Sequence, residues 1–254
     1  MLRTVFFGSS QYCLPVLEAL RPQLAQVITQ PDKPVGRKKI LTPSPVKTWA
    51  QKNNIPVATE LNTDCSLGIV ADYGKIIDES VFNRPKLGTF NIHFSKLPDL
   101  RGASPVQSAI LRGDTTSWIT IFKLEKTLDT GPILDKHEFP IFPTETAEEL
   151  YTRLFKEVAK YITTLDFSAK TTPQSGTPTY CKKLTREDGF IEYSHLLEPR
   201  TYNLFRAMSS WPGLWTLKKD RRMKIIKCYL AEGKLVLDEI QLEGEKPKKP
   251  LEPH

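Results

Sequence analysis

The N-terminal residues alternate between strand-like and helix-like patterns in a way that few folds accommodate. Residues 2–7 form an alternating, strand-like run, Gly8 to Ser10 form a tight turn, and residues 11–20 carry leucines at helical spacing before a second strand-like run at residues 25–29. A strand, a helix and a strand in direct succession favour parallel strands joined by a crossover helix. The chain therefore predicts a Rossmann-like α/β fold with a doubly wound, mostly parallel N-terminal sheet. The turn has a single glycine, so the G-x-G-x-x-G fingerprint of nicotinamide dinucleotide binding is absent.

The remaining elements are predicted from apolar periodicity and cap signals. Strands are predicted at residues 67–71, 88–94, 117–124 and 133–139. Helices are predicted at residues 46–52, from Ser104-Pro105 onward, and from Thr146 to about residue 165. Thr146 with Glu149 three residues later forms a capping box, which marks a helix N-terminus. Residues 30–45 contain four prolines and are expected to form an irregular, exposed loop.

Composition divides the chain into a large domain and a small one. The C-terminal part shows a short helix at residues 201–208 before strands at 223–230 and 234–242. A stretch rich in Ser, Thr, Pro and Gly precedes it, as is typical of a linker. The predicted parts are residues 1–165, the α/β domain; 166–180, the linker; 181–243, a small β-rich domain; and 244–254, a disordered tail.

Net charge and cysteine usage narrow the class of protein. The net charge of +7 favours a polyanionic partner, although such a charge also serves solubility alone. The four cysteines are far apart and form no C-x-x-C pair, so we expect reduced thiols and no metal site. No apolar run approaches the ~18 residues that span a membrane, and the N-terminus lacks the apolar segment of a secretory signal. We therefore expect a cytoplasmic protein with no membrane attachment.

Candidate functional side chains lie on the predicted strand at residues 88–94. Because side chains alternate along a strand, Asn91 and His93 share one face, and Phe90, Ile92 and Phe94 share the other. Ligand sites of α/β sheets lie beyond the carboxyl ends of strands, and Asn91 and His93 are close to the carboxyl end of this strand. A single histidine in a strand is more often a satisfied core residue, so these two residues alone do not define a site.

Three separated motifs together resemble the 10-formyltetrahydrofolate-dependent formyltransferases. The motifs are Asn91-Ile92-His93; Ser95-Lys96-Leu97-Pro98 followed by Arg101-Gly102; and Leu128-Asp129-Thr130-Gly131. The resemblance covers residues 1–165 and implies that Asn91, His93 and Asp129 are catalytic. It also implies a folate pocket lined by Ser95, Lys96, Leu97 and Pro98. Lys96 departs from the family pattern, which has an apolar residue at that position.

A basic segment resembles the loop by which some members of this family bind tRNA. Residues 30–47 are rich in proline, lysine and arginine, and the resemblance implies that Arg37, Lys38 and Lys39 reach the acceptor end of initiator tRNA. On charge alone, a solvated lysine-rich connector is the more common interpretation. The C-terminal domain is short and resembles its counterpart in the family only weakly, through Phe190-Ile191-Glu192 and Trp211-Pro212-Gly213.

The resemblance implies transfer of a formyl group from 10-formyltetrahydrofolate to the amine of methionyl-initiator tRNA, by a monomer and without a metal. The tetrahedral intermediate carries a negative oxygen, and we assign Asn91 and a protonated His93 as its donors. Asp129 would orient His93 and favour its charged form, or take the proton of the attacking amine. One alternative is a sugar-nucleotide N-formyltransferase with the same donor, favoured by the short C-terminal domain. A second alternative is a tRNA-binding protein without catalysis.

Overall fold

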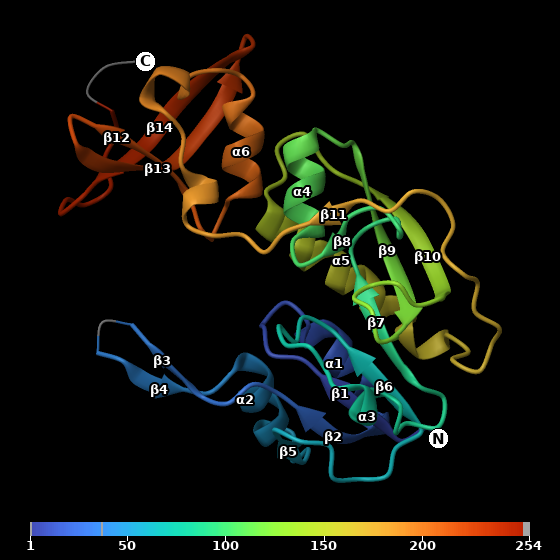
Figure 1. Cartoon of the computed structure of the whole chain (residues 1–254). Coiled ribbons are helices and arrows are strands. Elements are labelled where there is room, and N and C mark those ends of the chain that lie inside the picture. Colours follow the sequence, from blue (N-terminus) through green and yellow to red (C-terminus); the bar gives the residue numbers. More distant parts are fainter. Residues whose placement is uncertain (1, 37, 251–254) are drawn as a thin grey trace. The chain divides into compact units, whose positions relative to one another are not determined.

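The computed structural model describes residues 2–36 and 38–250 (Figure 1). The chain packs as two compact units that do not follow the order of the sequence. The first unit comprises Met1–Arg101, Trp118–Phe139 and Tyr151–Thr179. The second unit comprises Gly102–Ser117, Pro140–Leu150 and Tyr180–His254. Because the units exchange segments, the domain borders at residues 165 and 181 stay a prediction.

A seven-stranded sheet forms the centre of the first unit, in the order β10-β9-β7-β6-β1-β2-β5. The strands are β1 (Thr4–Phe7), β2 (Leu24–Ile28), β5 (Val57–Ala58), β6 (Leu67–Val70), β7 (Thr89–His93), β9 (Thr116–Lys123) and β10 (Ile133–Pro140). Strands β5, β2, β1, β6 and β7 are parallel, and β9 runs antiparallel to β7. The prediction of a doubly wound, mostly parallel sheet is confirmed.

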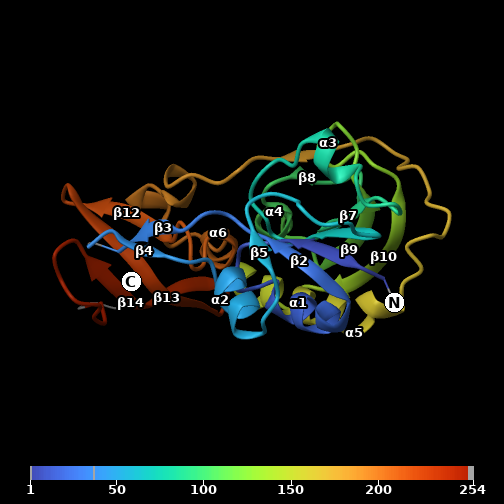
Figure 2. The same cartoon turned by 90° about the horizontal axis from the view of Figure 1, so that it is seen from below.

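Helices cover both faces of this sheet, with α1 and α5 on one side and α3 on the other (Figure 2). The helices of the first unit are α1 (Leu14–Leu20), η1 (Arg21–Gln23), α2 (Pro45–Lys52), α3 (Glu79–Phe82), η2 (Ile162–Thr164) and most of α5 (Ala147–Tyr161). Burial on both faces explains why the central strands are rich in apolar residues; all four residues of β1 are buried, for example. Helix α1 begins three residues later than predicted, because Cys13 is its N-cap and Pro15 occupies its first turn.

Residues 30–45 contain a hairpin where the sequence predicted an irregular loop. Strands β3 (Lys33–Val35) and β4 (Ile40–Thr42) pair antiparallel, with Val35 opposite Ile40. The hairpin projects from the sheet beyond α2 (Figure 1). Proline argues against a central strand but is tolerated in an isolated edge ribbon, which is why the proline content was misleading. Arg37 lies outside the described residues.

The second unit contains a three-stranded antiparallel sheet in the order β12-β13-β14. Its elements are α4 (Pro105–Arg112), β8 with its first residue in the other unit (Arg101–Gly102), β11 (Tyr180–Cys181), η3 (Glu187–Gly189), η4 (Tyr193–His195), α6 (Thr201–Ala207), β12 (Leu214–Lys218), β13 (Arg221–Ala231) and β14 (Lys234–Leu242). The core beneath the sheet includes Leu214, Met223 and Leu237. The predicted β-rich C-terminal part is therefore confirmed, although β12 was not predicted.

Residues 244–250, the first part of the tail that was expected to be disordered, pack against other residues of the second unit. Lys248 pairs with Ile240 of β14 through two backbone hydrogen bonds of 2.9 Å. Glu245 accepts from Arg221 and Lys248 side chains at 2.9 and 2.6 Å. Residues 251–254 lie outside the described residues, so for them the prediction stands untested. Within the described ranges, no helix is long and apolar enough to cross a membrane.

Candidate active site

Asn91 and His93 stand on β7, with the ladder between β7 and β9 fixing their direction. Asn91 lies opposite Phe122 and His93 opposite Thr120. Phe94, the next residue of opposite phase, packs against α5. Because side chains alternate along a strand, Asn91 and His93 point to the face away from α5. This arrangement is the one that the sequence predicts.

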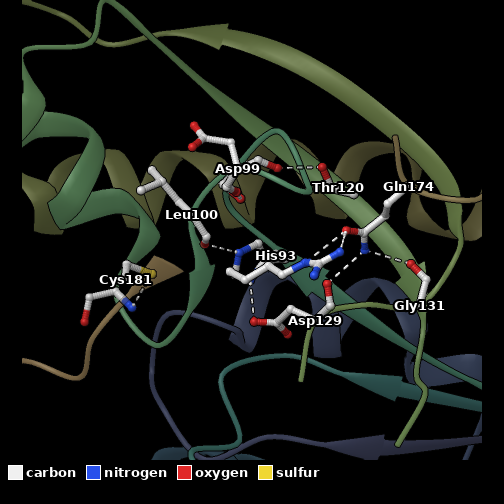
Figure 3. Close-up of polar contacts among 11 residues, drawn as sticks. His93, Asp99, Leu100, Thr120, Asp129, Gly131, Gln174 and Cys181 are labelled. Carbon is white, nitrogen blue, oxygen red and sulfur yellow. Dashed lines mark hydrogen bonds and ion pairs between the residues drawn. The ribbon is translucent and has the colours of Figure 1, made fainter. Parts of the chain in front are cut away.

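The ring of His93 is buried and is held by the backbone of Leu100 (Figure 3). Nε2 lies 2.9 Å from the carbonyl oxygen of Leu100. A carbonyl oxygen only accepts, so Nε2 carries a proton and the lone pair of the neutral ring is on Nδ1. The N–H of Leu100 in turn donates to Thr179 Oγ1 over 2.8 Å, which fixes the carbonyl that holds the ring.

Asp129 faces Nδ1 of His93, the ring nitrogen that carries the lone pair. The distance from His93 Nδ1 to Asp129 Oδ2 is 3.9 Å, and the two side chains are 6% and 5% exposed. This distance is too long for a hydrogen bond but allows a strong charge interaction in a buried site. Asn91 is half-buried, and among the described residues its amide has no hydrogen-bond partner. The structure thus brings the predicted catalytic residues to one face of β7.

Burial lowers the pKa of His93 below its ordinary value of 6.5. Attraction to Asp129 and the hydrogen bond to Leu100 act in the opposite direction, but their effect is smaller than that of burial. Burial therefore favours the neutral ring in the site without substrate, and a protonated His93 at the intermediate stays a prediction. The sequence motif indicates the carboxylate near His93, but it does not show how far burial removes water from the ring and lowers its pKa.

Backbone geometry explains the first and last residues of the D-T-G motif, Asp129 and Gly131. Asp129 adopts a left-handed φ of 54°, which aspartate tolerates better than most residues. A Cβ on Gly131 would lie 1.7 Å from the carbonyl oxygen of Lys123, so only glycine fits there. The motif therefore lets the loop between β9 and β10 return close to the sheet and present the Asp129 carboxylate to His93.

Gln174 ties this loop to the rest of the site, and sequence reasoning missed it. Its Nε2 donates to the carbonyl oxygens of Asp129 and Gly131, each over 2.8 Å. Its Oε1 accepts from Nε and Nη2 of Arg101, over 3.2 and 2.6 Å. Gln174 lies in the stretch predicted to be a linker, and nothing in its local pattern distinguishes it from its polar neighbours.

The segment predicted to line the folate pocket follows β7 directly. Ser95 is buried, and its hydroxyl donates to the carbonyl oxygen of Asp99. Leu97 is also buried, and Pro98 follows it through a cis peptide bond. Lys96, by contrast, is exposed and holds its ammonium 4.6 Å from the ring centre of Trp118. At the apolar position of the family pattern, this chain thus has a lysine whose ammonium contacts an aromatic ring.

The basic segment is anchored at its base and exposed at its tip. Gln30 Nε2 donates to the carbonyl oxygen of Tyr73 over 2.6 Å, just beyond β6, and Lys47 pairs with Asp32 at 2.7 Å. Lys38 and Lys39, the described residues of the three that were expected to bind tRNA, are exposed. Exposed apolar side chains accompany them on the hairpin, namely Val35, Ile40 and Leu41.

A second carboxylate stands at the carboxyl end of β6 and was not predicted from the sequence. Asp72 has a left-handed φ of 49°, and its carboxylate accepts hydrogen bonds from the hydroxyls of Ser10 and Tyr151. Burial is the largest influence and raises the pKa of Asp72 above 3.8, while both hydrogen bonds lower it. Because β6 and β7 are parallel neighbours, Asp72 belongs to the same sheet edge as the candidate site.

Known proteins match the chain over nearly its full length. The family profile described as Formyl transferase matches residues 3–165, and the profile described as Formyl transferase, C-terminal domain, matches residues 183–235. A methionyl-tRNA formyltransferase of Cereibacter sphaeroides is 34% identical over 286 aligned positions, which cover 99% of this chain and 94% of the relative.

Solved structures share the fold. A methionyl-tRNA formyltransferase from Clostridium thermocellum superimposes with a TM-score of 0.70 at 18% identity, over 95% of this chain and 99% of the other. An N-formyltransferase from Helicobacter canadensis, solved with folinic acid and dTDP-3-aminofucose, gives a TM-score of 0.64 at 19% identity, over 93% and 95%.

The sheet, the Asn-His strand and the profile match together define the class of protein: the chain belongs to the formyl transferase family. Within that family, the curated relatives at 34–37% identity are methionyl-tRNA formyltransferases, whereas sugar N-formyltransferases are similar in structure at lower identity.

Proposed function

We propose that this chain transfers the formyl group of 10-formyltetrahydrofolate to the amino group of methionine carried by initiator tRNA. The observation that carries the proposal is the meeting of Asn91, His93 and Asp129 on one face of β7, in a chain whose similarity to methionyl-tRNA formyltransferases extends over almost its whole length. Such a reaction takes place where charged tRNA and reduced folate are both present, so we expect the protein in the cytoplasm. We also expect it to be a monomer.

The proposed mechanism uses the neutral His93 ring as a proton carrier. The amine attacks the formyl carbon and forms a new C–N bond, while the Asn91 amide donates to the developing oxyanion. The ammonium formed by attack gives a proton to His93 Nδ1, whose lone pair is available because Nε2–H is held by Leu100. Asp129 stabilises the imidazolium through its opposite charge. His93 then returns the proton to the folate nitrogen as the C–N bond of the donor breaks.

For the acceptor, the basic hairpin supplies the proposed tRNA contacts. Lys38 and Lys39 are exposed, and Arg37 is adjacent to them in the sequence. Lysine and arginine that neutralise phosphates release counterions, so the affinity of such contacts falls as salt rises. A small amino-sugar acceptor would show little of this dependence. Salt therefore separates a tRNA substrate from a sugar-nucleotide substrate.

The test is an acceptor screen with 10-formyltetrahydrofolate, charged initiator tRNA and amino-sugar nucleotides. We expect formylation of methionyl-initiator tRNA, and a rate about 10²–10³ lower in Asn91→Ala or His93→Ala, because each removes one group that stabilises the transition state. Turnover of an amino-sugar nucleotide with no turnover of tRNA would replace the proposed acceptor. Binding of tRNA without turnover of any acceptor would support a non-catalytic protein.

A further inference from the structure

Trp118 lies on the same face of the sheet as the candidate active site. It precedes Thr120 by two positions on β9, and Thr120 stands opposite His93 in the ladder. Residues directly opposite in an antiparallel pair, and residues two apart on one strand, share a face. Thr120 Oγ1 also donates to the carbonyl oxygen of Ser95 over 2.6 Å, which holds the start of the segment after β7 against β9. Trp118 is therefore the next side chain along the face that carries His93.

Two lysines converge on the Trp118 ring. Lys96 Nζ lies 4.6 Å and Lys136 Nζ lies 6.0 Å from the ring centre. Both lysines are exposed, and within the part of the chain that the structure describes neither has a carboxylate partner. The aromatic face attracts an ammonium by about 0.5–1 kcal/mol at an exposed site, but it does not remove the repulsion between two cations. An anion between the two ammonium groups would offset this repulsion.

We infer that Lys96, Lys136 and Trp118 bind the single-stranded 3′ end of the acceptor tRNA, with the lysines taking a phosphate and the indole contacting a base. This inference rests on the proposed function. The methionyl group is esterified to the terminal ribose, so the nucleotides next to it must pass close to the reacting amine. Lys96 follows His93 by three residues, so their Cα atoms are at most about 11 Å apart. Trp118 is half-buried, and lysines beside a partly accessible aromatic ring are the usual chemistry for holding single-stranded nucleic acid.

The experiment compares Lys136→Met and Trp118→Leu with the wild type on two acceptors, charged initiator tRNA and methionyl-adenosine, which lacks the phosphates. Lys136 is chosen because Lys96 also belongs to the segment predicted to line the folate pocket. For tRNA, we expect KM to rise about five- to 160-fold in Trp118→Leu, the range given by the loss of one base stack of about 1–3 kcal/mol. In Lys136→Met, the slope of log kcat/KM against log salt should become shallower by about 0.7, the value for one phosphate contact on a single strand.

Two controls keep the inference falsifiable. Lys86→Met removes an exposed lysine before the amino end of β7 and should leave the salt slope and both acceptors unchanged. Trp118→Phe keeps an aromatic ring and should recover most of the tRNA KM if Trp118→Leu acts through stacking and not through misfolding. An equal loss on methionyl-adenosine and tRNA in Lys136→Met, a salt slope of that variant like that of the wild type, or a wild-type tRNA KM in Trp118→Leu would overturn the inference.

The donor provides the last comparison. A rise in KM for 10-formyltetrahydrofolate in Lys136→Met, with the tRNA KM unchanged, would assign the cluster to the glutamate carboxylates of the donor and overturn the RNA assignment. If the wild type formylates tRNA and these variants match it, only this inference fails. If the wild type does not formylate tRNA, the proposed function fails with it.

Discussion

Replacing Gln174 by alanine should slow formyl transfer although Gln174 touches neither reacting group. The change removes the two bonds that hold the carbonyl oxygens of Asp129 and Gly131 and the two that Arg101 makes to the same side chain. Each hydrogen bond contributes about 0.5–1.5 kcal/mol net, and water replaces part of this at a half-buried position, so we expect a loss of about 2 kcal/mol in the free energy of unfolding. For a chain of this size that lowers Tm by roughly 4–8 °C.

The effect on the rate follows from the position of Asp129. A displacement of about 1 Å at a catalytic group costs up to 10²-fold, so kcat should fall roughly ten- to hundredfold while KM for tRNA and folate changes little. Asp129 is also the group that raises the pKa of His93 against the larger effect of burial. A looser Asp129 should therefore lower that pKa further and move the acidic limb of the pH–rate profile to lower pH.

The assay is formylation of methionyl-initiator tRNA by the wild type, Gln174→Ala and Ser175→Ala across pH, with thermal unfolding of each protein. Ser175 is an exposed neighbour and serves as the matched control. A merely structural role of Gln174 would lower Tm and leave the pH limb in place. The reasoning is refuted if Gln174→Ala keeps the kcat and the acidic limb of the wild type.

Three further outcomes are expected. Because burial lowers the pKa of His93, kcat/KM should stay level as pH falls through 6.5, and the stability that neutral His93 contributes, present above pH 6.5, should be lost as pH falls through the lowered pKa. Replacing both Lys38 and Lys39 by alanine should make the salt dependence of tRNA formylation shallower by up to about 1.8, as the kinetic slopes will show. The raised pKa of Asp72 means that its protonated carboxyl group contributes stability that is fully present below pH 3.8 and is lost as pH rises through the raised pKa, so Asp72→Asn should raise Tm at pH 7. Asp78→Asn, at an exposed helix cap whose hydrogen bonds lower its pKa, should not.

Strand composition, a helix capping box and side-chain alternation could be predicted from the sequence because each depends only on neighbouring residues. Val5, Phe6 and Phe7 are apolar because β1 is buried on both faces, and that composition is visible in the sequence. The Thr146–Glu149 capping box forms as predicted, with Glu149 accepting from the backbone N–H of Thr146 over 2.8 Å. The alternation that placed Asn91 with His93 likewise needs only the period of a strand.

Features that depend on distant contacts were not predicted. Gln174 acquires its role from Arg101 and Asp129, which are separated from it by 73 and 45 residues. The charge state of His93 depends on how completely the fold removes water from it, and a neighbouring carboxylate in the sequence motif says nothing about that. The β3–β4 hairpin escaped prediction because prolines lie in and around it, whereas a two-stranded ribbon has open edges on which proline costs little.

The distance between His93 and Asp129 bears on the choice of an amine as acceptor. A lone pair on Nδ1 and a carboxylate oxygen 3.9 Å away repel each other, and neither supplies a hydrogen to the other. A group with several hydrogens between them can donate to both at once. The ammonium that forms when an amine attacks has such hydrogens: one can go to Nδ1 while another is donated to the carboxylate. A hydroxyl acceptor carries a single hydrogen and can donate to only one of the two groups. The pair thus favours an amine at the step where the new bond forms.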